Sequence, residues 1–109
     1  MRSIEPLVAA LHLTRVCGDG TPQYEGVYAG DLLSRAMSRV HAGNLWITIM
    51  NNVNVIAVAS LTEAAAVILA EDVALSDEVK KAAEDEGIAV YRCSDGVYDV
   101  CRKIAALEQ

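Results

Sequence analysis

The sequence predicts an α/β fold, a single domain in which residues 45–107 form a three-stranded parallel β-α-β-α-β-α unit. Short apolar runs rich in β-branched residues alternate there with longer segments that have helical patterns and caps. The connections between them are only a few residues long, which favours a parallel sheet with right-handed crossovers. The chain has 109 residues, the length of one domain, so residues 1–109 are expected to fold as one unit.

Three apolar runs are expected to form the parallel strands. Nearly every residue in these runs is apolar, which is typical of strands that helices cover on both faces. The runs are residues 45–50, 65–70 and 88–91. The segment between the first two runs, residues 53–61, follows a pair of asparagines and is expected to be a buried helix.

The other two helices of this unit have recognisable ends. The helix over residues 77–86 is expected to begin after the N-cap Ser76 and to stop at Gly87, because glycine readily adopts the left-handed conformation that ends a helix. The last helix is expected after a cap at Ser94 or Asp95. Its inward stripe is Val97, Val100, Cys101 and Ile104.

The first 44 residues are expected to add an N-terminal helix, one or two short edge strands and a second helix. The i, i+3, i+4, i+7 spacing of one helix face is present at Ile4, Leu7, Val8 and Leu11. The edge strands are expected within residues 12–17 and 25–29. Asp31 is expected at the start of the second helix, where the helix dipole favours an anion.

The composition limits the classes of partner and the compartment. A net charge of −6 and a pI of about 4.7 argue against nucleic acid, because proteins that bind phosphate backbones usually carry a basic excess. The longest apolar region, residues 45–70, contains asparagines and a glutamate that would be costly in lipid, so no membrane span is expected. Three cysteines without a paired spacing predict neither a disulfide framework nor a metal site, and the expected location is cytoplasmic.

Catalytic machinery is not recognisable in the sequence. The glycine-rich phosphate-binding patterns GxGxxG and GxxxxGK[ST] do not occur, and no nucleophile and base can be assigned as a pair. We therefore expect no catalytic residue, no metal site and no cofactor. The expected function is that of a non-catalytic regulatory or assembly module. The alternative is a small phosphotransfer or hydrolytic enzyme that acts on a phosphorylated metabolite.

Polar residues follow the predicted parallel strands at the edge where their carboxyl ends meet, which is where open parallel sheets usually bind ligands. Asn51 and Asn52 would supply amide groups there, and Arg92 would attract an anion. These three residues are the predicted site for a small anionic ligand or a nucleotide. The alternative is that they serve only as turn and cap residues, since these turns commonly use such residues.

The segment from Val53 to Leu61 is apolar on almost every side of a helix, so a sheet on one side would leave the other side uncovered. A two-fold homodimer would cover it. The expected interface residues are Val53, Val55, Ile56, Ala57, Ala59 and Ser60. The alternative is that the N-terminal helix of the same chain covers this surface.

Several of these segments together resemble the DRTGG domain. The resemblance rests on Gly30-Asp31-Leu32-Leu33 at a helix start, Leu45-Trp46-Ile47-Thr48 as a strand, the helix from Asn54 to Leu61, and Glu86-Gly87-Ile88-Ala89-Val90. It covers roughly residues 26–107. The residues that name the family are replaced here. Asn51-Asn52-Val53 stand where an Asp-Arg pair would be, and Ala70-Glu71-Asp72 stand where Thr-Gly-Gly would be.

This resemblance implies a domain that is regulatory and dimer-forming, without established catalysis. Such domains resemble the N-terminal domain of HPr kinase/phosphorylase. They occur at the N-terminus of some phosphate acetyltransferases and between the CBS domains of regulated pyrophosphatases. The chain looks like a divergent, free-standing member of the family. The resemblance agrees with the expected homodimer and with a module that senses a small anionic ligand or a partner protein.

Overall fold

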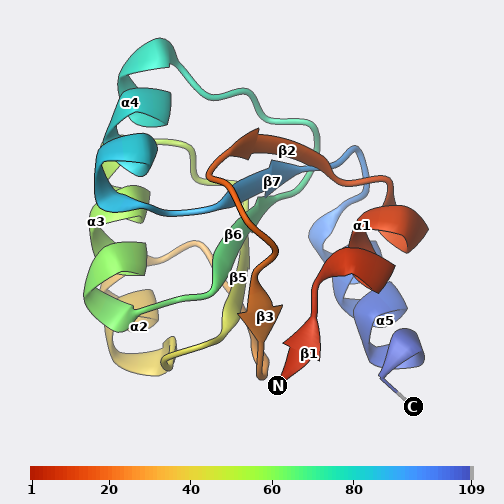
Figure 1. Ribbon diagram of the computed structural model, residues 1–109. Coiled ribbons are helices and arrows are strands. Elements are labelled where there is room, and N and C mark those ends of the chain that lie inside the picture. Colours follow the sequence, from red (N-terminus) through yellow and green to blue (C-terminus); the bar gives the residue numbers. More distant parts are fainter. Residues whose placement is uncertain (109) are drawn as a thin grey trace.

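The computed structural model describes residues 1–108 and shows a five-stranded sheet with helices on both faces (Figure 1). The strands are β1 (Arg2–Ser3), β2 (Thr14–Cys17), β3 (Gln23–Tyr24), β4 (Val27–Ala29), β5 (Leu45–Thr48), β6 (Ala66–Leu69) and β7 (Val90–Arg92). The helices are α1 (Glu5–Leu11), α2 (Leu33–Arg39), α3 (Val53–Thr62), α4 (Asp77–Glu86) and α5 (Val97–Leu107). The predicted α/β fold is confirmed.

The five-stranded sheet has the order β2-β7-β6-β5-β4, and β4 to β7 are parallel. The parallel part has one strand more than predicted, because β4 pairs with β5 in parallel along its whole length. At the other edge β2 runs antiparallel to β7, with a register shift between Arg15 and Cys17. Strands β1 and β3 pair with each other in a separate antiparallel sheet.

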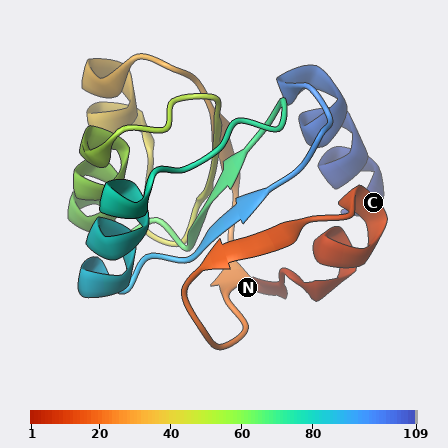
Figure 2. The same cartoon turned by 90° about the horizontal axis from the view of Figure 1, so that it is seen from above.

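The helices form two layers, one on each face of the sheet. Figure 2 shows α2, α3 and α4 side by side on one face, and α1 with α5 on the other. The side chains of β5 alternate between these layers, as a strand requires: Leu45 and Ile47 pack with α1 and α5, and Trp46 packs with α2, α3 and α4. The sheet is apolar on both sides because both sides are covered.

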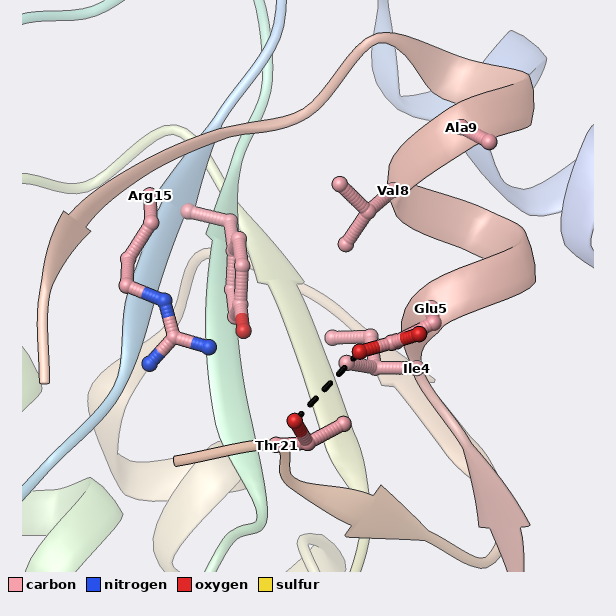
Figure 3. A pocket seen from close by; sticks show the side chains of 7 residues that line it. Ile4, Glu5, Val8, Ala9, Arg15 and Thr21 are labelled. Carbon is pink, nitrogen blue, oxygen red and sulfur yellow. Dashed lines mark hydrogen bonds between the residues drawn. The ribbon is translucent and has the colours of Figure 1, made fainter. Parts of the chain in front are cut away.

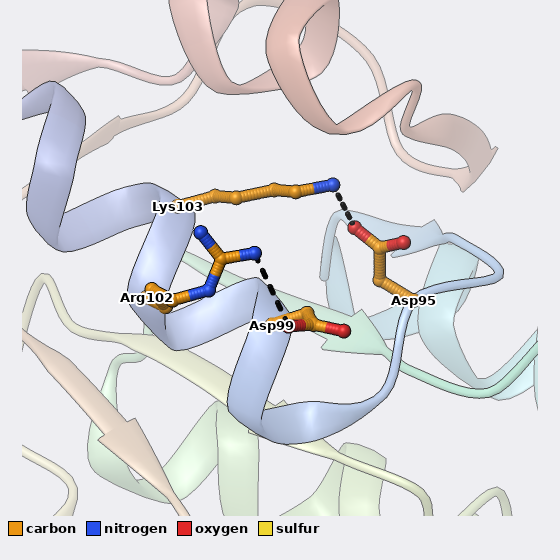
Figure 4. Close-up of polar contacts among 4 residues, drawn as sticks. All are labelled: Asp95, Asp99, Arg102 and Lys103. Atoms are coloured by element: carbon orange, nitrogen blue, oxygen red, sulfur yellow. Dashed lines mark hydrogen bonds and ion pairs between the residues drawn. The ribbon is translucent and has the colours of Figure 1, made fainter.

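Local caps place the ends of α4 as predicted. The hydroxyl of Ser76 accepts a hydrogen bond from the backbone N–H of Val79 at 3.3 Å. Gly87 ends the helix in the left-handed region, with φ at +69°. The predicted cap of α5 is wrong. The N-cap is Gly96, without a side-chain bond, because the carboxylate of Asp95 instead accepts from Lys103 at 2.7 Å (Figure 4).

More of α3 is covered within the chain than the sequence predicts. Helices α2 and α4 lie along its two sides, and α1 lies on the opposite face of the sheet, so the proposed cover by the N-terminal helix is wrong (Figures 1 and 2). Val55, Ile56 and Ala59 are at most 2% exposed and belong to the core between α3 and the sheet. These three residues of the expected interface therefore have no surface to offer a partner.

Candidate functional site

The carboxyl ends of the parallel strands β4, β5, β6 and β7 meet at one edge of the sheet, which we call the carboxyl edge. The segments that follow these strands carry the polar residues predicted as a site. They are residues 30–32, 49–52, 70–76 and 93–96. The common direction of the strands brings these distant parts of the sequence to one place.

Asp31, after β4, binds the end of the neighbouring strand β5. The hydroxyl of Thr48 donates to Oδ1 of Asp31 at 2.7 Å, and the backbone N–H of Ile49 donates to the same oxygen at 3.1 Å. Helix α2 begins after its N-cap, Leu32, so Asp31 lies just before the start of the helix, near the place predicted for it. Sequence reasoning missed this contact, although Thr48 is the one polar residue of β5 and is fully buried.

Asn51 and Asn52 each have a structural contact. The side-chain oxygen of Asn52 accepts from the backbone N–H of Asn54 at 3.0 Å and caps α3. The side-chain amide of Asn51 donates to the carbonyl of Ala74 at 2.7 Å. These contacts are the turn and cap roles that stood as the alternative to ligand binding.

Arg92, at the end of β7, forms an ion pair with Asp72, with 3.5 Å between Nε and Oδ1. Strand β6 lies between β5 and β7. In the segment after β6, Asp72 contacts Arg92 and Ala74 contacts Asn51. The structure therefore keeps Asn51 and Asn52 together at the end of β5. It separates them from Arg92 by residues 72–74.

The turn that carries Asp72 has an unusual backbone. Glu71 and Asp72 are both left-handed, with φ at +60° and +59°, a conformation that costs a residue with a side chain about 1–2 kcal/mol. Their N–H groups donate to the carbonyls of Asp95 and Cys93, both at 2.8 Å. These two bonds to the segment after β7 hold the turn and bring Asp72 to Arg92.

Several charges at this edge and on α5 are paired. Asp95 binds Lys103 at 2.7 Å, and Asp99 binds Arg102 at 3.2 Å (Figure 4). Such partly exposed pairs contribute at most about 1 kcal/mol each. Burial raises the pKa of the nearby Cys93 thiol, so this thiol is protonated at neutral pH and is a poor nucleophile. Of the acids at this edge, Asp72 and Asp95 are engaged in ion pairs, and Asp31 accepts the bonds from Thr48 and Ile49.

A cavity of about 290 Å³ lies beside the edge strand β2, between α1, β2 and β7 (Figure 3). Tyr91 lines it and is 1% exposed, and its buried hydroxyl has no hydrogen-bond partner among residues 1–108. The guanidinium carbon of Arg15 lies 5.1 Å from the centre of the Tyr91 ring. Sequence reasoning treated both as ordinary strand residues, because only the antiparallel pairing of β2 with β7 places Arg15 opposite Tyr91.

Within residues 1–108, no three His, Cys, Asp or Glu side chains are placed to hold a metal ion together. Of the helices described above, none has the length and apolar character needed to cross a membrane.

The fold and these contacts define a small α/β domain whose carboxyl edge is tied together by caps, turns and ion pairs. A family model, the DRTGG domain, matches residues 7–107. The chain therefore belongs to the DRTGG domain family, which confirms the predicted resemblance.

The fold is similar to that of a solved regulatory protein. This is the crystal structure of the CBS and DRTGG domains of the regulatory region of Clostridium perfringens pyrophosphatase, complexed with its activator diadenosine tetraphosphate. The TM-score is 0.75 at 12% identity, over 92% of this chain and 44% of that chain. At this identity the likeness concerns the fold alone. Among curated proteins, no match to the sequence was found.

Proposed function

We propose that this chain is a non-catalytic regulatory or assembly module that forms a homodimer and senses a small anionic ligand, such as a nucleotide, or a partner protein. In this proposal residues 1–109 act as one DRTGG-like domain. Two findings support a regulatory role. They are the family match and the likeness in fold to the regulatory region of a pyrophosphatase complexed with an activator.

An apolar stripe on the outer surface of α3 carries the proposal of a dimer. Val53, Ala57 and Leu61 recur every four residues and are exposed, Val53 by 37% and Leu61 by 73%. Met37 on the neighbouring helix α2 is 54% exposed. Exposed apolar residues that gather on one surface are typical of protein interfaces. We therefore centre the interface on this α3 stripe, with the half-buried Ser60 beside it.

Sedimentation equilibrium at micromolar concentration tests the dimer. The protein should have about twice the chain mass of 11.6 kDa. Ala57→Arg should weaken association on the order of a thousandfold, because it would bury a charge without a partner. Ala106→Arg, at another exposed alanine, on α5, is the matched control and should leave the dimer intact. A wild-type protein that is monomeric throughout this range would contradict the proposal.

The anionic ligand is proposed to bind at the carboxyl edge, near Asn51, Asn52 and Arg92. The start of α3 favours an anion there because its N–H groups point outward from the first turn. Arg92 could turn to the ligand because its pair with Asp72 is partly exposed and weak. Amide shift mapping with phosphate, AMP and ATP tests this. Shifts gathered at these three residues support the site, and their absence at millimolar ligand contradicts it.

The same proposal places the module in the cytoplasm, with neither nucleic acid nor a membrane as partner. Cys17, Cys93 and Cys101 are free thiols, two of them buried, which suits a reducing compartment. The net charge of −6 opposes binding to phosphate backbones. An enzyme of the alternative class would need an anion cradle and a base in one place. The acids Asp72 and Asp95 at the carboxyl edge are instead paired with cations.

A further inference from the structure

The cavity beside α1 has an apolar wall and a charged rim. Its wall is formed by Ile4, Val8 and Ala9. Its rim carries Arg15 from β2 and Glu5 from the start of α1. In Figure 3 the guanidinium of Arg15 and the carboxylate of Glu5 lie on opposite sides of the cavity, with Val8 toward one end and Thr21 toward the other. A ligand in this cavity therefore meets a cation on one side and an anion on the other.

Both charged groups have further bonding capacity. Arg15 donates to the carbonyl of Gly20, which uses one of the five N–H donors of a guanidinium. Glu5 accepts from the hydroxyl of Thr21 at 3.4 Å through one oxygen, and a carboxylate has two. These contacts hold the two side chains at the rim and leave atoms of each for a ligand.

Tyr91 is an independent feature of the same cavity. Its hydroxyl is buried without a hydrogen-bond partner in the described chain, and buried polar groups in that state are rare because they are costly. A phenylalanine would fill the same space in β7 without this cost. Burial also raises the pKa of Tyr91, and the guanidinium of Arg15 opposes this only in part, through its charge and its approach to the hydroxyl, so the hydroxyl keeps its proton and can donate. A ligand acceptor would satisfy it once the side chains that cover the hydroxyl move aside.

We propose that this cavity binds a free α-amino acid with an aliphatic side chain. Arg15 and Tyr91 hold its carboxylate, Glu5 holds its ammonium group, and the wall of Ile4, Val8 and Ala9 receives its side chain. This cavity is a second site, distinct from the anion site proposed at the carboxyl edge, and the inference rests on the proposed function only for the regulatory meaning of binding.

The size of the cavity agrees with such a ligand. A volume of about 290 Å³ has room for a ligand of about ten non-hydrogen atoms. Leucine, with about nine non-hydrogen atoms, is of this size. A nucleotide is more than twice as large and would extend beyond this cavity.

Titration of the isotope-labelled full chain with L-leucine, followed by amide NMR spectra, tests the inference. We expect saturable shifts around residues 4–9, Arg15 and Tyr91, with a Kd on the order of 1 mM or tighter for a ligand of this size. Isocaproate has the same skeleton without the ammonium group, and isoamylamine has it without the carboxylate. Each should bind at least tenfold more weakly, since each loses a charged hydrogen bond.

Two variants connect the binding to named residues. Glu5→Gln should weaken leucine binding at least tenfold, whereas Glu78→Gln, an exposed acid on α4, should not change it. Tyr91→Phe should weaken binding about tenfold without lowering the midpoint of urea unfolding, because the hydroxyl it removes has no partner. The second variant thus separates ligand binding from folding.

Three results would overturn the inference: no shifts with millimolar leucine, equal binding of isocaproate, or unchanged binding by Glu5→Gln. The state of assembly, measured in the same samples, keeps this test apart from that of the proposed function. A dimer that does not respond to leucine overturns the amino-acid site alone. A monomer that binds leucine overturns the dimer alone.

Discussion

Replacing Asp31 by alanine should destabilise the protein by about 2–3 kcal/mol. The substitution removes the acceptor of two hydrogen bonds, from the hydroxyl of Thr48 at 2.7 Å and from the backbone N–H of Ile49 at 3.1 Å. Each contributes about 1 kcal/mol, below the range of about 1.5–3 kcal/mol for a charged acceptor, because Asp31 itself is exposed. The fully buried hydroxyl of Thr48 is then left without an acceptor, which adds about 1 kcal/mol.

A double-mutant cycle with Thr48→Val isolates the bond between the two side chains. Valine keeps the shape of threonine, so this variant alone should cost about 1–2 kcal/mol, for the bond to Asp31 and the bond that the hydroxyl accepts from Met50 at 3.2 Å. The double variant should cost about 1 kcal/mol less than the sum of the two single variants, because both remove the same bond.

Urea unfolding followed by the fluorescence of Trp46, the single tryptophan and a fully buried one, measures these differences. Asp19→Ala, at an exposed acid in a loop, is the matched control and should change stability by less than about 0.5 kcal/mol. Additive effects of Asp31→Ala and Thr48→Val, or a loss from Asp31→Ala no larger than that of the control, would refute this reasoning.

Burial raises the pKa of Tyr24 from 10.0 to about 12. Between these pH values the folded protein keeps a proton that the unfolded chain loses. The free energy of unfolding should therefore fall by up to about 2–3 kcal/mol as pH rises from about 10 to about 12. Tyr24→Phe should lack this part of the fall in urea titrations at each pH, and an unchanged pH profile would contradict the assignment. Ser76→Ala should cost about 1 kcal/mol through loss of the cap on α4, whereas Ser76→Asp should retain most of the stability. Incubation with labelled ATP, Mg²⁺ and candidate acceptors should give no transfer above background, and turnover abolished by Asp72→Asn would show that the protein is an enzyme.

Local features of the sequence determine the elements that were predicted well. Ser76 and Gly87 place the ends of α4 through bonds within a few residues, and the continuous apolar runs at β5 and β6 indicate strands covered on both faces. The predicted family resemblance depends on the same runs. Short-range propensities and caps operate before any tertiary contact forms, so they can be recognised in the sequence.

The candidate site could be predicted only in part. Parallel strands bring Asn51, Asn52 and Arg92 to one edge of the sheet, as expected. What each side chain does there depends on the turn after β6, which contacts Asn51 through Ala74 and Arg92 through Asp72. The left-handed backbone of that turn is held by hydrogen bonds to the segment after β7. The residues next to the turn in the sequence do not indicate this conformation.

The sequence by itself determined the alternation of strands and helices, the apolar core and the family. Only the tertiary structure decided that β2 pairs with β7, which places Arg15 opposite Tyr91. It also decided that Asp31 binds Thr48. It also decided which side of α3 is buried, because that helix is apolar all round and has no periodicity to indicate a face. The physical reason is that local propensity acts over a few residues, whereas pairing and burial depend on residues that only the folded chain brings together.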